Sequence, residues 1–173
     1  RLSLVGSEMC IRDRSWSTAK HMKPTITSVA AEEYPALIDI WEASVRATHD
    51  FLPEANIQRL RPLILNVYLA AVTLRAARDD SGRLLGFAGV HEGKLEMLFI
   101  DPACRGSGVG KALLAHAITE LGVREVDVNE QNPQAVGFYL HLGFQVSGRS
   151  ELDGQGEPFP LLHLNLVAPQ GAA

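Results

Sequence analysis

The sequence predicts a single α+β domain built around a mixed, mostly antiparallel sheet. Its 173 residues are 46% hydrophobic, which is enough apolar side chain to bury one core. Strand-like and helix-like stretches follow one another in the order β-α-α-β-β-β-α-β-α-β-β. Short turn signals, such as residues 79–82 (Asp-Asp-Ser-Gly), join consecutive strand-like stretches, which is typical of antiparallel neighbours.

The first half of the chain predicts one strand and then a helical region. Residues 25–29 are strand-like, and residues 31–48 place apolar side chains at helical spacing with two glutamates near the positive end of the helix. Residues 49–53 interrupt this pattern. Residues 55–69 resume it, although Pro62 favours a kink or a break. Two helices and one broken helix both fit this region.

The second half predicts a three-stranded meander, a helix, a strand, a short helix and a final pair of strands. Gly122 is placed to end the first of these helices, and Asn132-Pro133 is placed to start the second. The predicted strands are 72–78, 84–91, 94–100, 123–128, 144–150 and 161–166, and the predicted helices are 112–121 and 135–142.

Residues 1–21 are expected to be a non-native extension, because residues 2–14 (LSLVGSEMCIRDR) look like a translated sequencing adapter. The natural domain would then be residues 22–173. Without the extension the formal charge changes from −4 to −6, and an acidic domain is a poor nucleic-acid binder. Cys104 becomes the only cysteine, which excludes an internal disulfide. No apolar run approaches the roughly 20 residues that cross a bilayer, so we expect a cytoplasmic protein without a membrane partner.

A glycine loop at residues 105–111 (Arg-Gly-Ser-Gly-Val-Gly-Lys) lies between a predicted strand and a predicted helix. Glycines at every second position let backbone N–H groups approach an anion, and the helix start adds roughly half a positive charge. The loop fits neither common nucleotide motif. A Rossmann fingerprint needs glycine at Lys111, and a P-loop needs glycine at Arg105 and serine or threonine at Ala112. It therefore predicts a phosphate cradle of another kind.

Four segments together resemble the GNAT superfamily of N-acetyltransferases, in particular the small bacterial YjaB-like acetyltransferases. They are the glycine loop, residues 97–102 (MLFIDP), residues 128–132 (VNEQN) and residues 138–144, which carry Phe-Tyr and Gly-Phe. The resemblance spans residues 22–168, and the segment 47–52 (ATHDFL) shares it. It implies a GNAT-like fold, in which helices flank a twisted sheet, and acetyl-CoA as the cosubstrate.

The resemblance also implies which residues bind the cosubstrate. Backbone groups of Leu98, Phe99 and Ile100 would hydrogen-bond the pantetheine arm. Asn132 stands where the family often contacts pantetheine, although helix capping explains an asparagine before proline equally well. The pyrophosphate would be held by the backbone N–H groups of the glycine loop, that is, Arg105, Gly106, Ser107, Gly108, Val109, Gly110 and Lys111.

Two residues are expected to act in catalysis. Tyr139 matches the tyrosine that protonates the departing CoA sulfur in many GNAT enzymes; its alternative role is core packing. An amine with a pKa of about 10.4 is almost wholly protonated at pH 7, so a group must help to remove its proton. Glu96, on the strand before the glycine loop, is one candidate base. His49 and Asp50 compete with it, because the resemblance places them with Phe51 in the acceptor pocket.

The sequence thus indicates an enzyme that moves an acetyl group from acetyl-CoA to a primary amine by direct attack, with a small-molecule amine as the favoured acceptor. Transfer to a protein lysine or N-terminus is the alternative within this class. A non-catalytic acyl-CoA-binding sensor is the alternative outside it. Some relatives complete their acceptor pocket with a second subunit, so a homodimer fits the sequence as well as a monomer. The histidines show no shared ligand spacing, so we expect no metal.

Overall fold

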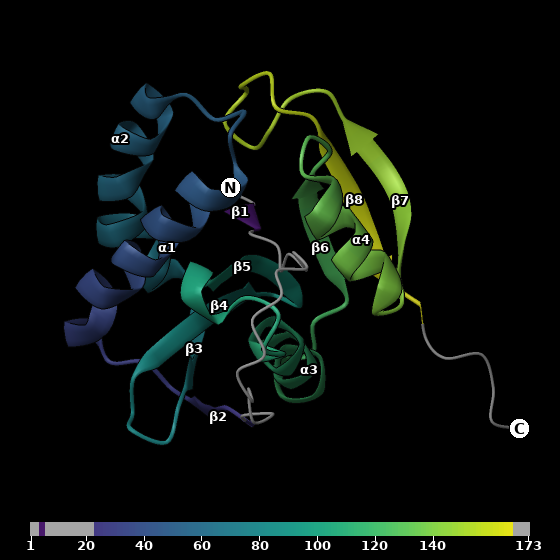
Figure 1. Ribbon diagram of the computed structural model, residues 1–173. Coiled ribbons are helices and arrows are strands. Elements are labelled where there is room, and N and C mark those ends of the chain that lie inside the picture. The colour runs from purple at the N-terminus through teal and green to yellow at the C-terminus, as the bar shows by residue number, and fades with distance from the viewer. Residues whose placement is uncertain (1–3, 6–22, 168–173) are drawn as a thin grey trace, which may run out of the picture.

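The centre of the molecule is one eight-stranded sheet (Figure 1). The computed structural model describes residues 4–5 and 23–167 of the chain. The strands follow the order β2-β3-β4-β5-β6-β8-β7, and β1 (Leu4–Val5) pairs with β5 outside this path. Within the path only β5 and β6 are parallel, and every other pair is antiparallel. The predicted α+β fold with a mostly antiparallel sheet is confirmed. The predicted extension lies outside the described residues, apart from β1.

The strands end within two residues of their predicted bounds. The meander and the final strand pair are long alternating or apolar runs between clear turn signals. Their bounds can therefore be predicted closely from the sequence. The strands are β2 (Thr25–Thr27), β3 (Thr73–Arg78), β4 (Leu84–His91), β5 (Lys94–Ile100), β6 (Glu125–Asn129), β7 (Phe144–Ser150) and β8 (Leu161–Leu166).

The first helical region forms two helices, α1 (Tyr34–Thr48) and α2 (Glu54–Leu63). Pro62 does not break α2. Instead, the chain continues into a π-helical turn at Ile64–Tyr68. Proline lacks an N–H and crowds the carbonyl group four residues before it, and a change of helix type shifts the hydrogen-bond partners beyond such a position. The helical path therefore continues where the sequence predicts a kink or a break.

Helices α3 (Val109–Leu121) and α4 (Pro133–His141) both begin at a recognisable cap. Gly108 precedes α3 in the left-handed conformation, so this helix starts three residues before the predicted range. Asn132 caps α4, because its side chain accepts a hydrogen bond from the Ala135 N–H at 3.2 Å.

Two hydrophobic cores lie on opposite faces of the sheet. Helices α1 and α2 cover one face, where the fully buried Trp41 packs near Phe87 and Phe99. Helices α3 and α4 cover the other face, where Leu98 and Tyr139 belong to the core. Each face buries its own set of apolar side chains, which fixes the register of the central strands.

Strands β5 and β6 pair only at their first residues and then diverge. Among the described residues their register is limited to Lys94 with Glu125 and Leu95 with Val126. On its other side β5 has a bulge, because Gly89 pairs with Met97 and Val90 with Leu95, which leaves Glu96 unmatched. Beyond this point, β1 lies beside β5 at Met97 and Leu98 and also contacts β6. The structure therefore opens the sheet at its centre.

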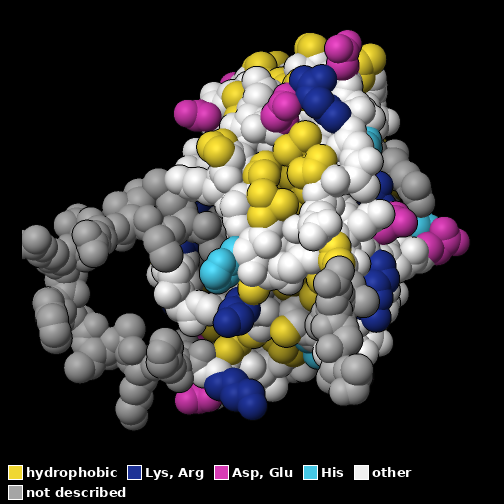
Figure 2. Space-filling model, turned by 90° about the vertical axis from the view of Figure 1, so that its right-hand side faces the viewer, with side chains coloured by type: hydrophobic (Ala, Val, Ile, Leu, Met, Phe, Trp, Pro, Cys, Tyr) yellow, Lys and Arg dark blue, Asp and Glu magenta, His cyan; other side chains and the backbone are white. Residues whose placement is uncertain are grey.

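The surface mixes charges of both signs. Figure 2 shows the side of the molecule that carries α4 and β7, where apolar side chains gather in the middle and acidic and basic side chains are interspersed around them.

The Asp127 carboxylate on β6 has two cationic or polar partners. One of its oxygens accepts a hydrogen bond from Lys94, and the other lies 2.6 Å from His163 Nδ1. This pairing satisfies a carboxylate that is only 8% exposed.

Replacement of Gly86 and of Gly137 by alanine is expected to change the free energy of unfolding in opposite directions. A Cβ at Gly86 would lie 2.7 Å from the Phe99 carbonyl oxygen and 2.8 Å from Ile100 Cδ1, so we expect Gly86→Ala to lower the free energy of unfolding by about 1–3 kcal/mol. Gly137, on the exposed side of α4, has open space around it, so Gly137→Ala should raise that free energy by up to about 1 kcal/mol. Urea unfolding measures both. Equal effects of the two variants would contradict the close packing of β4 on β5.

Candidate active site

The glycine loop joins β5 to α3 as predicted. Gly106 and Gly108 have φ values of +72° and +87°, which side chains other than glycine rarely adopt. The Gly108 carbonyl accepts the first hydrogen bond of α3 from the Ala112 N–H at 3.0 Å. The backbone N–H groups before this bond lie outside the regular hydrogen-bond pattern of the helix. The loop can therefore present main-chain donors to an anion.

The Arg105 side chain turns away from the loop toward α1. Its Nη2 donates to the Ser44 carbonyl at 3.4 Å, and Ser44 is buried near the end of that helix. Burial lowers the pKa of the Arg105 guanidinium. The side chain thus connects the glycine loop to the C-terminal part of α1. The predicted contact of Arg105 with the pyrophosphate therefore uses only its backbone N–H group.

The predicted pantetheine contacts lie on β5, where the sheet opens. Phe99 and Ile100 pair with Phe87 and Gly86 of β4, and Leu98 pairs with Ala88 on that side and with Val5 of β1 on the other. An extended chain therefore occupies the edge of β5 that faces β6. The pairing with β1 indicates that this edge of β5 accepts an extended chain through main-chain hydrogen bonds.

Tyr139 lies on α4 and is fully buried. Its ring meets Phe138 and Phe144 edge-on, with centroid distances of 5.1 and 5.6 Å. Its hydroxyl has no hydrogen-bond partner among the described residues, which is unusual for a buried group. Burial raises the Tyr139 pKa well above its usual value, so the hydroxyl keeps its proton. The group is therefore a donor that lacks an acceptor.

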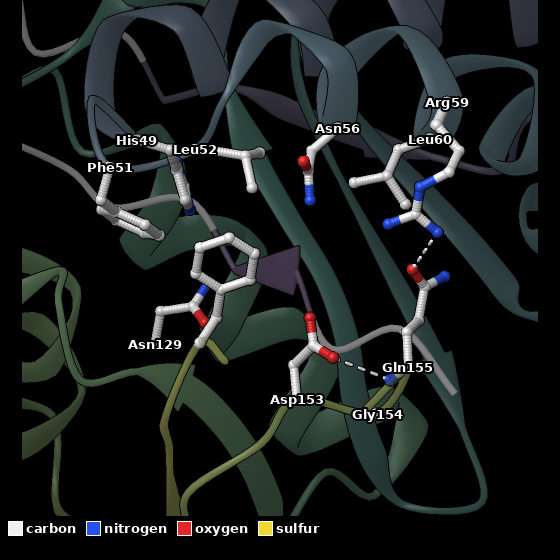
Figure 3. A pocket seen from close by; sticks show the side chains of 11 residues that line it. His49, Phe51, Leu52, Asn56, Arg59, Leu60, Asn129, Asp153, Gly154 and Gln155 are labelled. Carbon is white, nitrogen blue, oxygen red and sulfur yellow. Dashed lines mark hydrogen bonds between the residues drawn. The ribbon is translucent and has the colours of Figure 1, made fainter. Parts of the chain in front are cut away.

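A narrow cavity of about 20 Å³ lies between the α1–α2 loop and the β7–β8 loop (Figure 3). Arg59 of α2 donates to Gln155 at 3.0 Å, and Gln155 also contacts the Tyr68 hydroxyl at 3.4 Å, so these two elements are tied together beside the cavity. The lining residues are His49, Phe51, Leu52, Asn56, Arg59, Leu60, Asn129, Asp153, Gly154, Gln155 and Phe159.

His49 and Phe51, two of the residues predicted for the acceptor pocket, both line this cavity. The His49 ring points from the end of α1 toward Asn129 (Figure 3). His49 is 2% exposed, and desolvation lowers its pKa from 6.5 to about 4. The Arg105 cation lowers this pKa further, whereas Asp50 opposes the shift. At neutral pH the imidazole is therefore uncharged.

The other two candidate bases lie elsewhere. Asp50 is exposed and lines a separate cavity of about 320 Å³ beside Asn132 and the start of α4. Glu96 is buried at the bulge of β5 and lines a third cavity, of about 280 Å³, together with Tyr68 and His91. The structure therefore does not bring Glu96, His49 and Asp50 together around one point.

Asp153 and Asn129 line the His49 cavity, although the sequence analysis assigns neither to the site. One oxygen of Asp153 accepts the N–H groups of Gln155 and Glu157, each at 2.9 Å, and the other points into the cavity (Figure 3). The Asp-Gly-x-Gly pattern at 153–156 predicts a turn but does not predict which cavity the turn lines. Asn129 ends β6, directly across the opening from β5.

The sheet opens at its centre, glycines with positive φ values precede a helix, and a tyrosine hydroxyl is buried. Together these features define an acetyltransferase of the GNAT type. The model of the acetyltransferase (GNAT) domain family matches residues 55–159, and the chain belongs to this family. It is therefore an acetyl-CoA-dependent N-acetyltransferase.

Individual relatives make the comparison more specific. The chain is 47% identical over 138 residues to the peptidyl-lysine N-acetyltransferase YjaB of Salmonella typhimurium, a match that covers 80% of this chain and 93% of that protein. The solution structure of apo YjaB from Escherichia coli, at 41% identity, superposes with a TM-score of 0.78 over 86% of this chain and all of that one. The PaiA N-acetyltransferase of Thermoplasma acidophilum, solved in complex with coenzyme A, shares the fold at 22% identity with a TM-score of 0.66, over 84% of this chain and all of that one.

The buried His49 should make the protein less stable in mild acid. Its pKa is about 4 in the folded protein and about 6.5 in the unfolded chain, so the unfolded chain binds more protons between these values and the free energy of unfolding falls as the pH drops. At about 1.4 kcal/mol per pKa unit, the loss between pH 6.5 and pH 5 is about 2 kcal/mol. Urea unfolding at both pH values should show this loss in the wild type and in His141→Gln, an exposed control, but not in His49→Gln. A loss of equal size in all three proteins would contradict the assignment.

Removing residues 1–21 should strengthen binding of coenzyme A. Strand β1 pairs with Met97 and Leu98 on the edge that the pantetheine arm is expected to use, so the two would compete. If β1 gains about one net hydrogen bond there, its removal should lower the Kd for coenzyme A roughly five- to tenfold. Isothermal titration calorimetry of residues 22–173 against the full chain measures this change, and an unchanged Kd would show that β1 does not compete.

Proposed function

We propose that the protein transfers the acetyl group of acetyl-CoA to the side-chain amine of lysine in proteins. The observation that carries this proposal is the lining of the His49 cavity. The apolar side chains of Phe51 and Leu60 line it together with the Asp153 carboxylate. A lysine side chain has an apolar arm and a cationic end, which match apolar walls and a carboxylate.

Two further observations favour lysine over the small amine that the sequence analysis prefers. The YjaB relatives are named peptidyl-lysine N-acetyltransferases. Arg59 lines the cavity as well as Asp153, so the lining is not the strongly acidic one that would attract a small polycation. Because acetyl-CoA and newly made proteins share the cytoplasm, we place this reaction there.

The cosubstrate fits the opened sheet. The main-chain N–H groups at the start of α3 would hold the pyrophosphate, and the edge of β5 at Leu98 and Ile100 would pair with the pantetheine arm. Both contacts use backbone atoms, so side chains there need only leave room. The open space around the Cβ positions of Gly106 and Gly108 agrees with this arrangement.

The reaction is a direct transfer. The amine nitrogen attacks the thioester carbonyl, so a C–N bond forms and the C–S bond breaks. The N–H groups of β5 would polarise the carbonyl. Tyr139 would protonate the departing sulfur, and its buried hydroxyl without a partner is available for that role. The pKa of Tyr139 is raised by burial, so its proton is released only to a strong acceptor such as a desolvated thiolate.

An acceptor panel tests the proposed function. Purified protein receives acetyl-CoA and one of three acceptors: a lysine peptide with a blocked N-terminus, the same peptide with a free N-terminus and no lysine, or a small diamine. Release of thiol should be fastest with the blocked lysine peptide. Asp153→Asn keeps the oxygen that holds the turn but removes the charge, so KM for that peptide should rise roughly tenfold.

Tyr139→Phe is the matched test of the acid, because it removes only the hydroxyl. It should lower kcat roughly a hundredfold and leave the affinity for coenzyme A unchanged. Faster turnover of the diamine would overturn lysine as the acceptor. Tight binding of coenzyme A without turnover of any acceptor would instead indicate a sensor module.

A further inference from the structure

The nitrogen of His49 that faces the acceptor cavity has no hydrogen-bond partner. Its Nε2 is buried and unpaired among the described residues, and the ring points into the cavity (Figure 3). Buried polar atoms are normally satisfied within the protein. An unpaired nitrogen directed into the cavity that is proposed to receive the amine is therefore a candidate contact for that amine.

A neighbouring hydroxyl group determines where the imidazole carries its proton. Thr48 Oγ1 lies 2.7 Å from the Ser44 carbonyl oxygen and 2.7 Å from His49 Nδ1. A hydroxyl has one hydrogen, and a carbonyl oxygen can only accept, so that hydrogen points to Ser44. His49 Nδ1 must then carry a hydrogen and donate it to Thr48 Oγ1. Nε2 is left with a free lone pair.

The surroundings keep the imidazole neutral. Burial and the Arg105 cation disfavour the charged ring, and the Asp50 carboxylate favours it. The resulting pKa of His49 is about 4. Phe51 packs against the ring at a centroid distance of 5.2 Å and adds no charge. At pH 7 the free lone pair on Nε2 is therefore present in nearly every molecule.

We infer that His49 Nε2 accepts an N–H of the attacking amine, and that Thr48 is a positioning residue that holds the imidazole in the required tautomer. This inference rests on the proposed function and adds to it the residue that takes the proton. Neither Thr48 nor the Ser44 carbonyl touches the acceptor. They act on it through His49.

The protons balance in this scheme. The lysine ammonium loses one proton to solvent, and the neutral amine then donates an N–H to His49 Nε2. When the C–N bond forms, the nitrogen becomes cationic and far more acidic, so even a weakly basic imidazole takes its proton. The C–S bond then breaks, and Tyr139 gives its proton to the sulfur. The proton on His49 returns through solvent to Tyr139.

Thr48→Val tests the inference, because it keeps the shape of the side chain and removes the hydroxyl. Long-range proton–nitrogen NMR of histidine-labelled protein should show His49 with hydrogen on Nδ1 in the wild type and in Thr48→Ser. In Thr48→Val a substantial share should carry it on Nε2. With the lysine peptide, kcat should fall roughly tenfold in Thr48→Val and recover in Thr48→Ser, while the Kd for coenzyme A stays constant.

Thr119→Val is the control. The Thr119 hydroxyl also donates to a carbonyl of its own helix, at 3.0 Å from Ala115, but it is exposed on α3 away from the cavity. It should not change kcat or the His49 spectrum. Hydrogen on Nε2 in the wild type, or equal kcat in the wild type and Thr48→Val, would overturn the inference. If lysine is not the acceptor, turnover with the peptide is absent in every variant, including the wild type, while the tautomer spectra still report on Thr48.

Discussion

The divergence of β5 and β6 is the constraint on which the rest of the site depends. Two adjacent parallel strands would normally pair along their whole length, yet these two share register at only two positions among the described residues. The separation leaves an edge of β5 that β6 does not pair, inside a sheet that is packed on both faces, and β1 lies along this edge at Met97 and Leu98. It also places the end of β6, with Asn129, opposite β5 across the opening. In the proposed function, the cosubstrate and the acceptor meet at this opening.

The elements that carry the proposed cosubstrate half of the site are easier to predict from the sequence than those that carry the proposed acceptor half. The glycine loop, the end of β5 and Tyr139 come from one contiguous region with strong local signals, so their positions follow from turn, cap and periodicity rules. The acceptor cavity instead combines the α1–α2 loop, the end of β6 and the β7–β8 loop. No local sequence pattern predicts that Asp153 and His49, which are far apart in the chain, line the same cavity. Its assignment therefore requires the fold.

The candidate bases show the same limit at the level of single residues. Strand alternation places Glu96 on a face opposite Leu95, but the bulge at this point changes what that face meets. His49 and Asp50 are neighbours in sequence and line different cavities, because the end of α1 turns one inward and the other outward. The direction of a side chain at a helix end is set by packing, here by Thr48 and Phe51, rather than by sequence spacing.

The two halves of the site also differ in the atoms they use, and this has an evolutionary consequence. The main chain forms the proposed cosubstrate side, whereas side chains on a ten-residue loop and two helix ends form the proposed acceptor side, tied together by Arg59, Gln155 and Tyr68. Exchanges in that loop leave both hydrophobic cores intact. Proteins that descend from one ancestor can thus acquire new acceptors through substitutions in this loop alone, while the part of the site that donates the acetyl group stays unchanged.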